Sequence, residues 1–143
     1  MKKFFSKLPL ELLLVLLALI LILSGCSVSE DSADGKSSSW EQISMEDAMD
    51  LMDSEEGYII LDVRRADEFA SGHIPGAVNL ANEIIGEDDA AVEAALPDKD
   101  QLILVYCRSG NRSKQASEKL ADMGYTQIKE FGGIIDWPGE IEY

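Results

Sequence analysis

Residues 102–113 read Leu-Ile-Leu-Val-Tyr-Cys-Arg-Ser-Gly-Asn-Arg-Ser, and this stretch decides the fold of the chain. Residues 102–106 form an apolar run that predicts a buried strand. Cys107 follows that strand directly, and a helix is expected to begin near Arg112. A thiol placed between the end of a buried strand and the start of a helix is a candidate nucleophile.

The loop after Cys107 is suited to hold a negative charge. Its small residues let backbone N–H groups turn inward, and the positive end of the helix points at the sulfur. A free cysteine has a pKa of about 8.5, and lowering it by about two units requires roughly 2.7 kcal/mol. We expect the helix N-terminus, Arg108 and Arg112 to supply this stabilisation, which predicts a thiolate at neutral pH. The alternative, an inert buried cysteine, is disfavoured by the polar neighbours.

Strands alternate with helices along the chain on both sides of this stretch. Apolar runs predict further strands at residues 41–43, 58–63, 77–80 and 128–131. Helical patterns and their breakers predict helices at residues 45–52, 65–71, 82–96 and 112–123. This alternation predicts an α/β domain with a mainly parallel sheet between layers of helices. The ligand site of such a sheet lies at the carboxyl ends of its strands, where Cys107 falls.

The loop and four other stretches resemble the rhodanese family. The loop is similar to that family's six-residue active-site loop, with cysteine first and arginine sixth. The other matching stretches are Ile43-Ser44 with Glu46 and Ala48, Leu61-Asp62-Val63-Arg64 with Glu68-Phe69, Gly72-His73-Ile74-Pro75-Gly76-Ala77 with Asn79, and Gly132-Gly133-Ile134 with Trp137. The resemblance covers Trp40 to about Tyr143, and it implies a three-layer domain whose central sheet is flanked by helices on both faces.

Sulfur transfer is the activity that the resemblance implies. Cys107 would attack the outer sulfur of an anionic donor such as thiosulfate, carry it as a persulfide, and yield it to cyanide or a thiol. The two arginines of the loop would orient the donor, and the loop amides would hold the charged sulfur. The implied substrate-binding residues are therefore Arg108, Ser109, Gly110, Asn111, Arg112 and Ser113.

Four further residues are predicted to support the loop. Asp62, Arg64 and Glu68 are expected to form a buried ionic network below it, because an unpaired buried charge is costly. His73 is the only histidine, and we expect it to shape a turn by hydrogen bonding. No cluster of histidine and cysteine has metal-ligand spacing, so neither a metal nor another cofactor is expected.

Two other functions compete with a sulfurtransferase. Phosphatases and arsenate reductases of the same fold use a loop one residue longer, with arginine one place later, where this chain has Ser113. The shorter loop favours a single sulfur atom over a tetrahedral oxyanion. The second alternative is a non-catalytic persulfide carrier or a redox-sensing module that serves a partner protein through Cys107.

The N-terminus predicts export and a lipid anchor. Basic residues precede an apolar run over residues 12–23, which suits an export signal and is short for a transmembrane helix. Leu23-Ser24-Gly25-Cys26 resembles the lipobox of bacterial lipoproteins. The resulting organisation is a signal peptide over residues 1–25, a lipidated Cys26 with a disordered tether to residue 39, and a domain over residues 40–143. An uncleaved signal anchor is the alternative, and both place the domain outside the cytoplasm at a bacterial cell membrane.

Length, charge and cysteine content limit the partners. The chain has 143 residues and a net charge of −15, which allows one domain and argues against nucleic acid as a partner. With Cys26 lipidated, Cys107 has no intramolecular disulfide partner. The expected partners are a small sulfur-containing anion, a thiol or cyanide acceptor, the membrane through the Cys26 lipid, and a thiol-redox protein.

Overall fold

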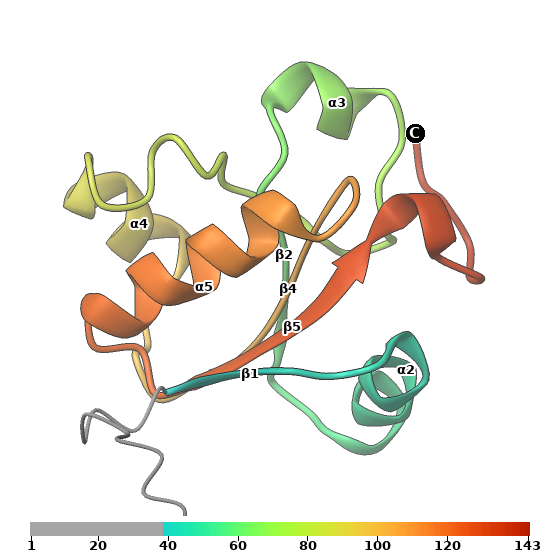
Figure 1. Ribbon diagram of the computed structural model, residues 1–143, viewed down its shortest axis with the longest axis horizontal. Coiled ribbons are helices and arrows are strands. Elements are labelled where there is room, and N and C mark those ends of the chain that lie inside the picture. Colours follow the sequence, from blue (N-terminus) through green and yellow to red (C-terminus); the bar gives the residue numbers. More distant parts are fainter. Residues whose placement is uncertain (1–38) are drawn as a thin grey trace, which may run out of the picture. The chain divides into compact units, whose positions relative to one another are not determined.

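A five-stranded parallel sheet organises the computed structural model, which describes residues 39–143. The strands lie in the order β1-β5-β4-β2-β3, and every neighbouring pair runs parallel (Figure 1). Their bounds are β1 Trp40–Gln42, β2 Ile59–Asp62, β3 Val78–Asn79, β4 Leu102–Cys107 and β5 Gln127–Gly133. The predicted α/β fold with a parallel central sheet is confirmed. The strands β4 and β2 lie inside the sheet, which explains their continuous apolar sequences.

Helices cover both faces of the sheet. Helix α2 (Met45–Ser54) lies on one face, and α4 (Asp89–Ala95) and α5 (Asn111–Asp122) lie on the other (Figure 1). The short helix α3 (Ala66–Ala70) follows β2, and a single 3-10 turn, η1 (Ile134–Asp136), follows β5. Each face has its own buried apolar cluster, one joined by Ala48 of α2 and the other by Val92 of α4 and Leu120 of α5. The domain therefore has three layers.

The segment between β3 and β4 differs from the predicted single helix over residues 82–96. Residues 82–87 form successive turns, and only Asp89–Ala95 is helical. Gly86 has a φ of +84°, a left-handed conformation that ends a helical path. Asp88 then begins a new helix, because its carboxylate accepts a hydrogen bond from the Ala91 amide. The other predicted helices agree with the structure to within about two residues at their ends.

The sheet brings the carboxyl ends of β4 and β5 together. Cys107 ends β4 and lies opposite Gly133 of β5, after an irregularity in the strand register between Val105 and Cys107. Gly110 then has a φ of +96° and precedes the first residue of α5. The thiol thus lies where a β-strand passes into a helix, as the sequence predicted.

The predictions for the N-terminal segment concern a different part of the chain. The signal peptide over residues 1–25 and the lipid on Cys26 lie outside the described residues, as does all but the last residue of the predicted tether. Within residues 39–143, every helix is too short or too polar to cross a membrane.

Candidate active site

The sulfur of Cys107 is enclosed by the loop that follows it. The residue is 1% exposed. Its Sγ accepts a hydrogen bond from the Gly110 amide at 3.1 Å and one from the Ser113 hydroxyl at 3.4 Å. Around it, Arg108, Ser109 and Asn111 are exposed. The sulfur therefore lies in a cup of backbone amides whose rim is open to solvent.

Hydrogen bonds to the sulfur outweigh its burial. Burial raises the pKa of the Cys107 thiol, but the Ser113 hydroxyl and the amides of Ser113, Ser109 and Gly110 lower it, and the pKa falls below its ordinary value. We predicted this direction, with the helix N-terminus and two arginines as its cause. In the structure, the donors that bond the Cys107 sulfur belong to the loop and to the first turn of α5, and neither of them is an arginine side chain.

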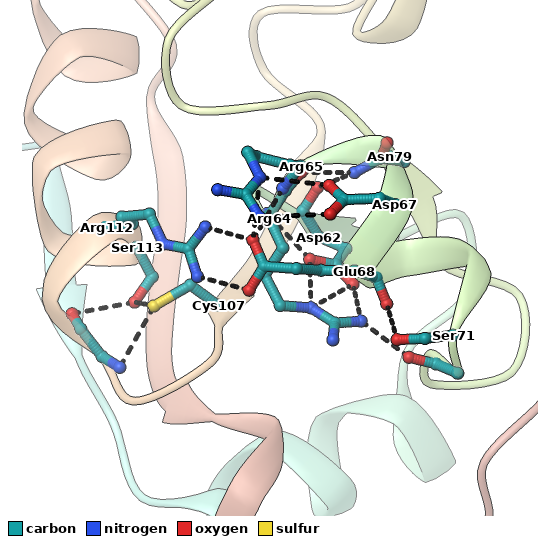
Figure 2. Close-up of polar contacts among 12 residues, drawn as sticks. Asp62, Arg64, Arg65, Asp67, Glu68, Ser71, Asn79, Cys107, Arg112 and Ser113 are labelled. Carbon is teal, nitrogen blue, oxygen red and sulfur yellow. Dashed lines mark hydrogen bonds and ion pairs between the residues drawn. The ribbon is translucent and has the colours of Figure 1, made fainter.

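Arg112 points at a carboxylate of another helix. Its Nη1 and Nη2 lie 2.6 and 2.8 Å from the two carboxylate oxygens of Glu68 on α3. Figure 2 shows the two side chains facing each other beside Cys107. The Arg112 bond lowers the pKa of Glu68 to about 2, and both Glu68 and the charge of Cys107 raise the pKa of Arg112. The arginine thus holds its charge next to the sulfur while its Nη1 and Nη2 each donate to Glu68.

Asp62 and Arg64 form a second and separate pair. The Arg64 guanidinium lies 2.6 Å from the Asp62 carboxylate, and both side chains are buried. Arg64 also donates from Nη2 to the Gly72 carbonyl at 2.7 Å, which ties the end of β2 to the turn that follows α3. We predicted one network of Asp62, Arg64 and Glu68, but the structure divides these residues between two pairs (Figure 2).

His73 stabilises the turn between α3 and β3. Its Nδ1 lies 3.1 Å from the Phe69 carbonyl, and its ring stacks on the Phe69 ring with centroids 3.8 Å apart. Its backbone also exchanges hydrogen bonds with Glu142 near the C-terminus. These contacts join His73 to Phe69 and Glu142 and are those of a turn-shaping residue. Phe131 and Trp137 pack against each other with centroids 5.8 Å apart and belong to the apolar cluster beneath α2.

Glu130 is a site residue that the sequence analysis missed. It is fully buried in β5, and its Oε1 accepts hydrogen bonds from the Ser113 hydroxyl at 2.6 Å and from the Gly132 amide at 2.9 Å. The alternation of side chains between the two faces of β5 could have revealed Glu130. Ile128 and Glu130 share a face, and the face of Ile128 is apolar core, so an acidic residue there marks a special environment.

Gly133 lets the loop pass close to β5. A Cβ atom on Gly133 would lie 2.2 Å from the Arg108 carbonyl oxygen and 2.5 Å from the Ser109 Cα. Only glycine fits such an approach of two backbones. The glycine pair that the sequence analysis noted for its resemblance therefore shapes the wall of the thiol cup.

The sequence of this domain matches that of known proteins. The rhodanese-like domain family matches residues 44–139. The chain is 37% identical to thiosulfate sulfurtransferase PspE of Escherichia coli over 76 residues, which cover 53% of this chain and 70% of PspE. It is 32% identical to the adenylyltransferase and sulfurtransferase UBA4 of Candida albicans over 105 residues, or 71% of this chain. That match spans only 24% of UBA4, so the chain corresponds to one part of the larger protein.

Solved structures agree with the sequence matches. A structure described as a rhodanese with anions, from E. coli, superposes with a TM-score of 0.54 and 32% sequence identity. The superposition covers 59% of this chain and 96% of that one. The likeness therefore extends through almost all of that structure.

Proposed function

Because the chain belongs to the rhodanese-like family, we propose that it is a sulfurtransferase in which Cys107 carries the transferred sulfur as a persulfide. The observation that carries the proposal is the cup of donors around Sγ, made of the Ser113 hydroxyl and the loop amides, which lowers the pKa of the thiol in spite of its burial. A thiolate is the nucleophilic form of cysteine, and the same amides suit the anionic persulfide that follows. Relatives named as sulfurtransferases support this assignment.

The first half-reaction removes sulfur from an anionic donor such as thiosulfate. The thiolate of Cys107 attacks the outer sulfur, an S–S bond forms, and sulfite leaves with the electron pair of the broken bond. The similar structure described with anions supports an anionic donor. Arg108 is exposed at the rim of the cup and is the cation we assign to donor capture. Arg112, held by Glu68, adds a fixed positive charge beside the sulfur.

The second half-reaction returns the enzyme to its starting state. Cyanide or a thiolate attacks the terminal sulfur of the persulfide, the S–S bond breaks, and the electron pair returns to Cys107. The amides of Ser109, Gly110 and Ser113 stabilise the negative charge on sulfur in both states, so each step exchanges one thiolate-like anion for another. Covalent catalysis of this kind gives ping-pong kinetics.

Turnover of thiosulfate with cyanide tests the function. We expect steady thiocyanate production by the native protein, its loss in Cys107→Ser, and its retention in Cys26→Ser, the matched control. Intact mass should show one extra sulfur atom on the native protein after donor alone. A single stoichiometric loading without turnover would make the domain a carrier, and phosphate-monoester hydrolysis that depends on Cys107 would favour a phosphatase.

We further propose that the domain is held at the outer side of a bacterial membrane by a lipid on Cys26. The support is the N-terminal sequence alone, with its basic start, apolar run and Leu-Ser-Gly-Cys ending. Intact mass of the membrane fraction should show cleavage before Cys26 and an added diacylglyceryl group. Retention of residues 1–25 without lipid, or recovery of the protein from the cytoplasm, would contradict the proposal.

A further inference from the structure

The hydroxyl of Ser113 lies between the reactive sulfur and a buried carboxyl group. Its Oγ is 3.4 Å from Sγ of Cys107 and 2.6 Å from Oε1 of Glu130, and the carbonyls of Gly110 and Gly132 lie 2.9 and 3.5 Å away. Ser113 has one hydroxyl proton, so it donates to only one of these acceptors at a time. Its oxygen can accept a proton from a second group. The three side chains therefore form a chain along which a proton can move.

Cys107 and Glu130, the two ends of this hydrogen-bonded series, differ in how well they hold a negative charge. Glu130 is 0% exposed, and within residues 39–143 its Oε2 has no hydrogen-bond partner. A buried carboxylate with an unsatisfied oxygen is costly, and protonation removes much of that cost. The sulfur is surrounded by amide donors that favour its anion. A single negative charge shared by the two groups is therefore more stable on the sulfur.

We propose that Glu130 accepts the proton of the Cys107 thiol through the Ser113 hydroxyl, so that the sulfur and the carboxyl share one negative charge. The S–H bond breaks as its proton passes to Oγ of Ser113, and the Ser113 proton passes to Oε1 of Glu130. The serine is unchanged, no proton enters or leaves the site, and nothing is oxidised or reduced. This proton transfer rests on the proposed function, because sulfur transfer requires the thiolate form of Cys107.

The charged groups around these three side chains are either paired or exposed to solvent. Arg112 of α5 faces the sulfur and is held by Glu68 of α3. Lys129, next to Glu130 in β5, is bonded to Glu41 of β1. On the other face of the sheet, Asp47 of α2 is bonded to Ser44, and Arg108 is exposed at the rim. Among the described residues, then, the polar contacts of the Glu130 carboxyl are those from Ser113 and Gly132.

The pH dependence of Cys107 alkylation tests the inference on the full chain. Iodoacetamide reacts with the thiolate, and peptide mass spectrometry separates Cys107 from Cys26. At low pH both groups hold a proton, and the first proton that the pair loses goes to solvent and leaves its charge on the sulfur. Glutamine carries no charge, like the protonated carboxyl, so we expect the midpoint of Glu130→Gln to lie within about 0.3 pH unit of the native one.

Two variants on the buried face of α5 separate a relay from a packing role. Ser113→Ala removes the link together with a hydrogen bond to the sulfur, so its midpoint should rise. Ser117→Ala is the matched control, because Ser117 is buried one helical turn away and is not bonded to the sulfur. Its midpoint should equal that of the native protein.

Three results would overturn the inference. A midpoint about one pH unit higher in Glu130→Gln would show that Glu130 acts only by ordering the Ser113 hydroxyl. A lower midpoint in Glu130→Gln would show that its carboxylate repels the thiolate. An unchanged midpoint in Ser113→Ala would exclude Ser113 as the link. If Glu130→Gln does not fold, an infrared carboxylic-acid band in the native protein, measured at a pH where Cys107 is alkylated, decides the question. Alkylation needs no sulfur donor, so these outcomes are separate from the turnover test.

Discussion

Two arginine–carboxylate pairs beside the Cys107 loop have similar geometry and different surroundings. Each brings a guanidinium nitrogen to 2.6 Å from a carboxylate oxygen. The side chains of Arg64 and Asp62 are 6% and 0% exposed, whereas those of Arg112 and Glu68 are 27% and 21% exposed. The first pair, called the sealed pair below, is buried, and the second, called the rim pair, is partly exposed beside Cys107 (Figure 2).

This difference assigns the pairs to different tasks. Arg64 bonds the Gly72 carbonyl, and the Asp62 carboxylate also accepts the Arg64 amide at 2.9 Å, so the sealed pair fixes the backbone at the end of β2. Glu68 accepts the Arg65 amide in addition to Arg112, and Arg112 interacts with the charge of Cys107. Burial makes the first pair essential for the fold, while exposure lets the second respond to pH.

Breaking the sealed pair is expected to have the largest effect on stability. Asp62→Asn keeps the shape of the side chain and leaves the Arg64 charge buried without its partner. We expect the free energy of unfolding to fall by about 3–5 kcal/mol. Denaturant unfolding measures this change. Asp67→Asn, in an exposed pair with Arg65, is the control and should unfold like the native protein. A loss below about 1 kcal/mol in Asp62→Asn would show that water reaches Arg64.

The rim pair is expected to show a smaller and pH-dependent effect. The pKa of Glu68 is lowered from 4.5 to about 2 by Arg112, so the folded state binds its proton less tightly than the unfolded state. The stabilisation is therefore complete above about pH 4.5 and is lost as the pH falls through about 2. Because both side chains are partly exposed, we expect about 1 kcal/mol.

Unfolding of Glu68→Gln as a function of pH measures that contribution. At neutral pH the variant should be less stable than the native protein, and the difference should shrink as the pH approaches about 2. A difference that stays constant with pH would mean that the loss comes from packing of the side chain. High salt should reduce the difference, because partly exposed charges are screened.

The two pairs also show what the sequence predicts and what it leaves out. The parallel sheet follows from apolar runs that alternate with helices, as in residues 102–106, whereas the order of its strands does not follow from them. The position of Cys107 follows as well, since the active end of such a sheet is known. The partner of each charge does not follow. Whether Glu68 bonds Arg64 or Arg112 depends on the direction of α3 relative to α5, which is a tertiary property.

The sequence also did not predict where the helical segment over residues 82–96 is divided or that Glu130 is buried at the site. The acidic segment over residues 82–96 has helical composition, but Gly86 and the capping residue Asp88 divide it. Glu130 was overlooked because a single acidic residue in a short strand is commonly on an exposed face. Its role depends on Ser113, which is 17 residues away in the chain and is brought to it only by the packing of α5 on β5.

The exposed pair of Arg65 and Asp67 is expected to give the smallest effect and to complete the comparison. Its side chains are 63% and 70% exposed, although Nε of Arg65 lies 3.1 Å from the Asp67 carboxylate. Water competes for both groups and salt screens them, so Arg65→Ser should unfold within error of the native protein at neutral pH. Nε of Arg65 also lies 3.9 Å from the Glu68 carboxylate. Removing Arg65 should therefore slightly weaken the pair of Arg112 and Glu68, and only at low salt. Unfolding at low and high salt checks both statements. A loss as large as that of Glu68→Gln would mean that contact geometry, and not burial, ranks the ion pairs around this loop.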